Sequence, residues 1–344
     1  MSPSGNTRIF ITGATGYIGG TVLSALLSNP ETDTFEITAL IRSAEKAPLF
    51  NSIGVKTVIG SNSDLDTLTS LASEADVVLA TADADDLNAA KAILRGLKKQ
   101  HEETKKVPIL IHTSGTGVLI DQAAGNFTAD KIYSDLDIPK IERLPKTQPH
   151  REVDIAVVAA DEEGYARTYT ILPSTIYGIA NTSLVSLGIQ NPYSRQIPLL
   201  IKTGLARGQG GVIGKGLNVW PSVHIDDTAT LYTTVFDAAT KGPGETGHGR
   251  EGFYFGENGE YSVGELSQAV AKLLYELGRG KSAEATVFTD EELDKYFVGP
   301  WFGSNSRACA ERARLIGWNP AHNIDSLYAS LRPEIEAIVA KQTA

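Results

Sequence analysis

Three glycines near the N-terminus follow a short apolar run and open a helical stretch. They are Gly13, Gly16 and Gly19, in the segment TGATGYIGG from residue 12 to residue 20. The first glycine permits a tight turn, the second lets the backbone approach a pyrophosphate, and the third lets the helix pack closely on the strand. The helix N-terminus offers free N–H groups and a positive dipole end to phosphates. The spacing predicts a dinucleotide-binding βαβ unit; a plain strand–helix turn is the simpler alternative.

The second apolar run ends in Arg42, where an acidic residue would suit the ribose diol of NAD. A guanidinium cannot accept the hydroxyl hydrogens, but it pairs well with a 2′-phosphate. Lys46, one helical turn further on, adds a second positive charge. We therefore expect NADP as the cofactor, with NAD as the alternative. The competing interpretation of Arg42 is a surface arginine at a strand end.

The pattern of the first half of the chain predicts the strands and helices that position these residues. Short apolar runs alternate with helix-period segments, which is typical of a doubly wound α/β fold with a parallel sheet. Strands are expected at 8–12, 36–41, 57–59, 77–80, 109–113 and 169–172. Helices are expected at 19–28, 65–75, 84–100, 151–163, 228–240, 263–277 and 324–341. The polar stretch 116–149 is expected to form a long excursion over the sheet, and such loops usually serve a site.

The regular alternation weakens after residue 178. We therefore expect a dinucleotide-binding Rossmann domain over residues 1–178, with a contribution from about 217–240, and a smaller, mainly substrate-binding lobe over residues 179–344. Aromatic residues of this half either line a substrate pocket or pack the lobe; they are Tyr193, Trp220, Phe253, Tyr254, Trp301 and Phe302.

Four motifs together resemble the extended and atypical short-chain dehydrogenase/reductases, the superfamily of NAD-dependent epimerases and dehydratases. The spacing TGxxGxxG is the first. Residues 173–178 (PSTIYG) resemble the PxxxYG turn, residues 220–227 (WPSVHIDD) the VHVDD segment, and residues 315–320 (LIGWNP) the C-terminal LGWxP. The resemblance covers nearly the whole chain and implies a Rossmann-type sheet with a C-terminal substrate lobe.

The resemblance also implies where a dinucleotide lies. After the third strand, serine stands where the family usually has aspartate, which leaves Asn62 or Asp64 for the adenine. The residues expected to contact the cofactor are Gly13, Thr15, Gly16, Tyr17, Ile18, Gly19, Arg42, Lys46, Asn62, Thr81, Ala82, Thr113, Pro173 and Thr175.

The Tyr-x-x-x-Lys pair of these reductases is missing, because no tyrosine here has lysine four residues later. In that pair the tyrosine moves a proton and the lysine lowers the phenol pKa. The family register puts His150 or Arg151 near the lysine position. Gly115 stands where the assisting hydroxyl is expected, with Ser114 and Thr116 as its neighbours.

Three side chains are candidates for an alternative acid, namely His150, Tyr133 and Tyr177. Histidine suits the task near neutral pH, and Arg151 would take the electrostatic role of the lysine. The competing interpretations are mundane: helix capping for His150 and loop anchoring for Tyr133. Three acids, Asp83, Asp85 and Asp86, follow the fourth strand and begin the helix expected at 84–100, where they either face a polar substrate or complement the helix dipole.

Composition excludes several functions. A formal charge of −10 and a pI near 5.2 argue against nucleic-acid and anionic-membrane partners. A single cysteine, Cys309, precludes an internal disulfide and a cysteine-based metal cage, so we expect no metal. Residues 1–6 contain no apolar leader, which favours a cytoplasmic protein. A small-molecule substrate is expected as partner, and a homodimer is a further expectation.

The leading hypothesis is an NADP(H)-dependent oxidoreductase, a reductase of a small organic carbonyl or unsaturated compound, with atypical catalytic residues. The missing pair keeps two alternatives open. One is a non-catalytic dinucleotide-sensing regulator, similar to the nitrogen-metabolite regulators, and the other is a non-redox epimerase- or dehydratase-like enzyme.

Overall fold

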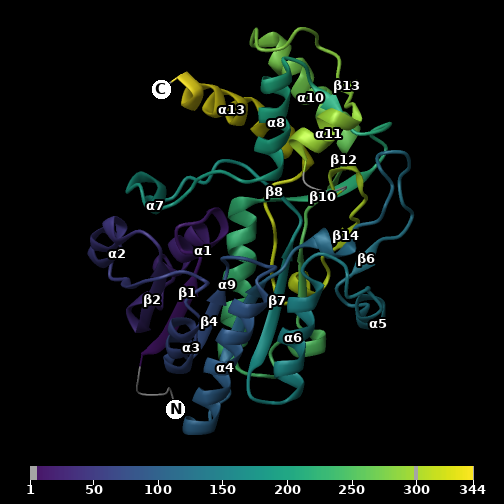
Figure 1. Ribbon diagram of the computed structural model, residues 1–344. Coiled ribbons are helices and arrows are strands. Elements are labelled where there is room, and N and C mark those ends of the chain that lie inside the picture. The colour runs from purple at the N-terminus through teal and green to yellow at the C-terminus, as the bar shows by residue number, and fades with distance from the viewer. Residues whose placement is uncertain (1–5, 298–300, 344) are drawn as a thin grey trace.

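A seven-stranded parallel sheet forms the centre of the computed structural model, which describes residues 6–297 and 301–343 (Figure 1). The strand order is β11-β7-β5-β4-β1-β2-β3. The bounds are β1 Thr7–Thr12, β2 Phe35–Ile41, β3 Lys56–Ile59, β4 Val77–Ala80, β5 Ile109–Thr113, β7 Arg167–Pro173 and β11 Phe253–Gly256. The predicted fold class is confirmed. Because β2 and β4 lie on opposite sides of β1, the order reverses at β1, and ligands of such sheets bind at the carboxyl ends near that reversal.

Helices cover both faces of this sheet, because successive apolar side chains of each strand point to opposite faces. Ile9 and Ile11 share one core with α1 (Tyr17–Leu27) and α9 (Ile225–Lys241). Phe10, between them, belongs to the core on the other face. That face is covered by α3 Leu65–Glu74, α4 Leu87–Thr104 and α6 Arg151–Glu162. Successive side chains of a strand point to opposite faces, so one apolar run supplies both layers.

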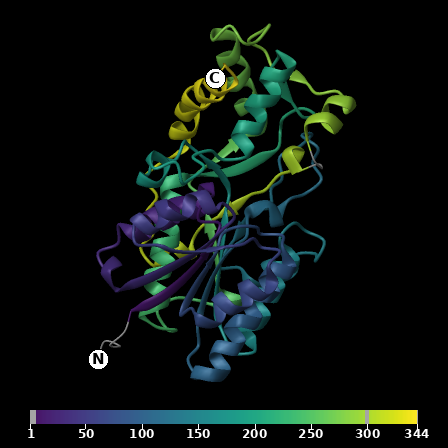
Figure 2. The ribbon, with the colours of Figure 1, turned by 60° about the vertical axis from the view of Figure 1, so that its left-hand side comes forward.

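A second lobe stands over the carboxyl ends of the strands (Figures 1 and 2). It has its own apolar core and a three-stranded sheet in the order β12-β10-β8. Its main elements are β8 Thr175–Tyr177, β10 Val219–His224, β12 Glu260–Ser262, α8 Gln196–Arg207, α10 Val263–Glu276 and α13 Ile324–Thr343. Strand β11 returns from the second half to the edge of the main sheet, beyond the range 217–240 expected for such a return.

The excursion after β5 is more ordered than a bare loop. Its elements are η3 Thr116–Leu119, β6 Tyr133–Ser134 and α5 Ile138–Glu142. Strand β6 pairs with β14 (Ala308–Cys309), which lies far along the chain. The remaining elements are η1 Thr32–Thr34, η2 Ala44–Lys46, α2 Ala47–Ser52, α7 Ser183–Ser186, β9 Gly211–Val212, η4 Gly249–Glu251, β13 Thr286–Val287, α11 Asp290–Tyr296, η5 Trp301–Gly303 and α12 Arg312–Leu315.

Two further observations bear on the expectations from sequence. Across residues 6–297 and 301–343, no helix combines the length and the apolar character that a bilayer crossing requires. The N-terminal stretch used to infer the lack of a leader lies, except for Asn6, outside the described residues.

Candidate active site

The glycine loop between β1 and α1 has the shape that a pyrophosphate requires. Gly13 has φ +77°, a left-handed conformation that favours glycine, and its carbonyl accepts a bond from the Gly16 N–H at 2.8 Å. A Cβ at Gly19 would lie 2.3 Å from both the Gly13 oxygen and the Thr81 Oγ1. The third glycine therefore lets α1 approach the ends of β1 and β4 in a way no other residue permits.

The N-terminus of α1 is open to an anion. Its N-cap, Gly16, provides no side-chain bond, and the first turn holds no acidic residue. The N–H groups of a first helical turn have no partners within the helix, so they are available to phosphate oxygens. This donor set fits the diphosphate of a dinucleotide.

Residues around the loop anchor it to the second lobe. The Tyr17 hydroxyl donates to the Gly178 oxygen at 2.5 Å and to the Tyr177 oxygen at 3.0 Å. The Asn191 N–H bonds the Thr15 oxygen at 3.0 Å. Burial raises the pKa of the Tyr17 phenol well above its usual value. The side chain of Tyr17 is thus engaged within the protein, and a cofactor contact at this position would use the backbone; Ile18 packs against the main core.

At the adenosine end, Arg42 is exposed and makes no hydrogen bond or ion pair with the described residues. Lys46 is partly buried and donates from Nζ to the Ile189 oxygen at 2.7 Å. The Asp64 carboxylate accepts from the Ser61 N–H at 2.6 Å and from its hydroxyl. The Asp64 carboxylate therefore closes its own loop, and both Asn62 and Asp64 stay predicted adenine contacts.

The remaining residues predicted to contact the cofactor lie at strand ends. The threonines among them already form hydrogen bonds within the protein through their hydroxyls. Thr81 Oγ1 donates to the Thr12 oxygen at 2.6 Å. Thr113 is bonded to the Tyr232 hydroxyl at 2.5 Å, and Thr175 to the Tyr261 hydroxyl at 2.8 Å. Cofactor contacts at these threonines would therefore come from the backbone. Ala82 follows β4 and is exposed, while Pro173 ends β7 and is buried.

His150 lies at the carboxyl end of the sheet in a fixed orientation. It precedes α6 with φ +66°, and Asp85 Oδ1 accepts from its backbone N–H at 2.9 Å and contacts its Nδ1 at 2.8 Å. A Cβ at Gly115 or Gly117 would lie 3.2 or 3.1 Å from His150 Nε2. Because a carboxylate accepts, the hydrogen bond requires that Nδ1 carries a proton. Nε2 is therefore the ring nitrogen that can exchange a proton with a substrate.

A buried polar cluster lies behind His150. Asp154 is fully buried, neither of its oxygens has a hydrogen-bond partner among the described residues, and burial raises its pKa to about 7. Ser114 and Thr116 are buried with unbonded hydroxyls. His112, in β5 and two residues before Ser114, is held neutral because burial lowers its pKa to about 4.

Arg151 does not point toward the opening as the lysine role would require. It is buried, its Nη2 donates to the Glu142 oxygen at 3.4 Å, and burial lowers its pKa. Its charge acts on Asp154, where it opposes the effect of burial.

The two tyrosine candidates are placed less favourably than His150. Tyr177 is 1% exposed, donates its hydroxyl to the Asn323 oxygen at 2.9 Å, and has its pKa raised by burial. Tyr133 lies in β6, where its ring is flanked by the ammonium groups of Lys131 and Lys140. Neither arrangement leaves a phenol poised to donate at the end of β5.

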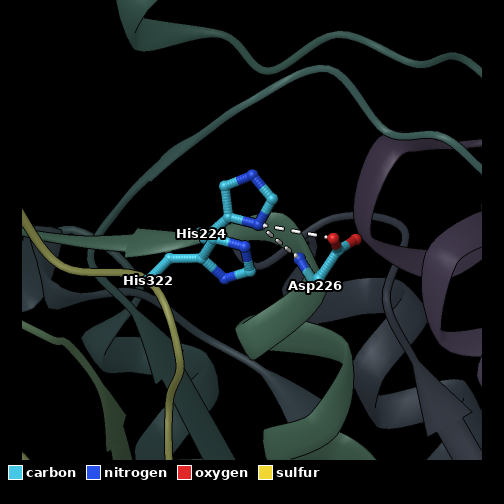
Figure 3. Close-up of side chains that lie close together, drawn as sticks. All are labelled: His224, Asp226 and His322. Carbon is cyan, nitrogen blue, oxygen red and sulfur yellow. Dashed lines mark hydrogen bonds and ion pairs between the residues drawn. The ribbon is translucent and has the colours of Figure 1, made fainter. Parts of the chain in front are cut away.

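Two histidines and an aspartate that the sequence did not predict to meet lie side by side, namely His224, His322 and Asp226 (Figure 3). Their ligand atoms lie within 4.8 Å of one another. The two imidazoles stack, with centroids 3.9 Å apart and planes at 25°. Imidazole lone pairs lie in the ring plane, so nearly parallel rings do not aim at one ion.

Hydrogen bonds account for both rings of this cluster. His224 Nδ1 accepts from the Asp226 N–H at 3.2 Å and so caps α9. His322 Nδ1 lies 3.1 Å from the buried Asp227 carboxylate, which also accepts from the His322 and Ala321 N–H groups. The cluster fastens the C-terminal segment to α9, and the expectation that the protein binds no metal stays a prediction.

Comparison with known proteins agrees with this geometry. Residues 13–136 match a family model described as NAD(P)H-binding. The oxidase ucsJ of an Acremonium species is 29% identical over 97% of each chain. An uncharacterized protein of Schizosaccharomyces pombe is 28% identical, covering 92% of this chain and 96% of its own.

Solved structures show the same fold at low identity. UDP-glucose 4-epimerase of Thermotoga maritima superposes with a TM-score of 0.66 at 16% identity, covering 98% of this chain and 100% of that one. The dTDP-glucose 4,6-dehydratase DesIV of Streptomyces venezuelae, solved with NAD bound, gives 0.65 at 17% identity over 98% of each chain. Residues 13–136 therefore match an NAD(P)H-binding family model, and the chain has the fold that this epimerase and this dehydratase share, which is the fold its motifs predicted.

Proposed function

We propose that this protein is an NADP(H)-dependent oxidoreductase that reduces a small organic carbonyl or unsaturated compound, with His150 as the proton donor. The observation that carries the proposal is the Asp85–His150 pair. It places an oriented imidazole beside Gly115, where the related reductases have their assisting hydroxyl. The Acremonium relative named an oxidase, similar along its whole length, supports a redox reaction.

Each group of the pair has a separate task in this proposal. Bound NADPH would supply a hydride to the substrate carbon. His150 gives the proton on Nε2 to the substrate oxygen as negative charge develops there, and takes it back in the reverse direction. Asp85 accepts the hydrogen bond from Nδ1, which keeps the ring oriented. The glycine loop and the α1 N-terminus hold the diphosphate.

Arg42 supports NADP over NAD in this account. Its guanidinium is exposed and unpaired among the described residues, so it keeps its donors for a 2′-phosphate. Lys46 contributes a weaker electrostatic effect, because one of its hydrogens already bonds the Ile189 oxygen.

Binding and turnover measured on the same preparation test the proposal. We expect NADPH to bind, and its absorbance to fall with at least one member of a panel of aldehydes, ketones and enones. Tight NADPH binding without turnover on any member would contradict the enzyme proposal and favour the dinucleotide-sensing regulator. Conversion of a sugar nucleotide with no net change in NADPH would favour the epimerase- or dehydratase-like alternative.

A further inference from the structure

A cavity of about 440 Å³ lies outside the candidate active site. It is formed by β6, α5 and the residues that follow α5. In Figure 1 α5 lies on the β7 and β14 side of the molecule, whereas α1 lies on the β1 and β2 side. No lining residue belongs to the glycine loop or to the ends of β1, β4, β5 and β7. The volume is in the range of small-molecule pockets.

Three cations line this cavity with a single carboxylate, Asp137. Lys131 Nζ lies 4.3 Å and Lys140 Nζ 5.1 Å from the centre of the Tyr133 ring. Lys140 also donates to the Ile132 oxygen at 2.6 Å. Asp137 caps α5 by accepting from the Lys140 N–H, so its carboxylate is already engaged.

Of the three cations, Arg143 has the fewest contacts with other described residues. It is exposed, and its guanidinium makes no ion pair, hydrogen bond or ring contact with residues 6–297 or 301–343. Two other arginines of this acidic protein are paired, since Arg250 lies 2.5 Å from Glu142 and Arg307 lies 2.6 Å from Glu260. Within residues 6–297 and 301–343, no ion pair joins the cations of the cavity to a carboxylate, although the net charge of the chain is −10.

The remaining walls are apolar. They consist of the buried Tyr133 ring, Leu144 and two prolines. The Tyr133 hydroxyl forms no hydrogen bond with the described residues, so it remains available as a donor. A cavity with cations at one side and apolar walls at the other fits a ligand with an anionic group and an apolar body.

We propose that the cavity formed by Lys131, Tyr133, Lys140, Arg143 and Leu144 is a binding site for a small organic anion, a carboxylate or a phosphate monoester. The anionic group pairs with Arg143 and Lys131, and the apolar body packs on Tyr133 and Leu144. This site is independent of the dinucleotide site and of the proposed oxidoreductase activity.

Calorimetric titration of the full chain with simple probes tests this site. NADPH at saturation keeps phosphate probes out of the glycine loop. Phenyl phosphate and benzoate carry the anion and the apolar body, inorganic phosphate carries the anion alone, and benzyl alcohol the body alone. The test variant is Lys131→Gln/Arg143→Gln. The matched control is Lys91→Gln/Arg95→Gln, which removes two exposed charges from α4.

We expect an aromatic anion to bind wild type and the control equally, and the test variant at least tenfold more weakly. Stronger binding of phenyl phosphate or of benzoate identifies the class of anion. Three results would each overturn the proposal: no binding of either aromatic anion up to about 10 mM, equal affinity in the test variant, or benzyl alcohol binding as tightly as the anions. Because all four substituted side chains are exposed, both variants are expected to fold.

Discussion

At the scale of single residues, the proposed chemistry rests on the His150 ring, which Asp85 holds, and on the exposed guanidinium of Arg42. His150 follows from the family register, and Arg42 follows from its place at a strand end. The partner of His150 does not, because Asp85 lies 65 residues away and reads equally well as a helix-dipole acid. Lys46 and Asp64 stay predictions, and the bond from Lys46 to the Ile189 oxygen follows from the fold and from no local sequence pattern.

Arg42→Asp should weaken NADP binding far more than NAD binding. The change removes the cation expected to pair with the 2′-phosphate and adds a carboxylate that repels it. We expect a loss for NADP on the order of 10- to 100-fold, which corresponds to about 1.4 to 2.7 kcal/mol. Fluorescence titration with both reduced cofactors measures it, and equal losses for the two would refute the assignment.

Asp154→Asn should change how stability depends on pH. The folded carboxyl, with its pKa raised to about 7 by burial, keeps its proton where the unfolded chain, with a pKa near 3.8, has released it. The contribution of Asp154 to the free energy of unfolding is therefore fully present below pH 4. It is lost as pH rises toward 7, and the loss is at most about 4 kcal/mol. The asparagine does not titrate.

Melting curves at pH 5 and pH 8 measure this effect. The melting temperature of Asp154→Asn relative to wild type should be higher at pH 8 than at pH 5. His112 and Glu334 titrate in both proteins, so their contributions cancel in the difference. An identical difference at both pH values would show that Asp154 is already ionised at pH 5; Glu102→Gln, at an exposed site, serves as the control.

At the scale of elements, long periodic segments could be predicted and short ones could not. Six strands of the main sheet and helices such as α3 and α6 lie within a few residues of their predicted bounds, whereas no strand was predicted at β11. Strand β6 has two residues and exists because it pairs with β14, about 175 residues later. No local pattern encodes such a partner. The same holds for the stack of His224 on His322.

Gly19→Ala tests the packing of α1 on the strand ends. The new methyl would lie 2.3 Å from the Gly13 oxygen and Thr81 Oγ1, so α1 must move away from the loop. We expect at least tenfold weaker NADPH binding and a lower melting temperature. Gly244→Ala is the control, since a Cβ there meets nothing within 4 Å. Unchanged affinity in Gly19→Ala would mean that the third glycine is not needed for close approach.

At the scale of the whole molecule, the chain folds into two lobes with separate apolar cores. The aromatic residues predicted either to line a pocket or to pack a lobe mostly pack. Phe253 and Tyr254 belong to β11 of the main sheet, and Trp220, Trp301 and Phe302 contact one another in the second core. Composition alone cannot separate these roles, because both bury aromatic area.

Tyr17→Phe tests how the glycine loop is tied to the second lobe. The hydroxyl bonds the carbonyls of Tyr177 and Gly178, which connect β8 to the rest of that lobe. Its loss leaves buried acceptors unpaired and should lower the free energy of unfolding by about 1 to 3 kcal/mol. Tyr275→Phe, on an exposed residue of α10, is the control. Equal stability of the two variants would show that the lobes do not depend on this bond.

The His150→Asn variant tests the central claim most directly. Asparagine tolerates the φ of +66° and so keeps the backbone, but it cannot donate a proton as imidazolium does. On any substrate that wild type turns over, we expect kcat to fall by a factor of about 100 or more. The NADPH dissociation constant should stay nearly unchanged. An unaltered kcat would contradict the role of His150 as the proton donor.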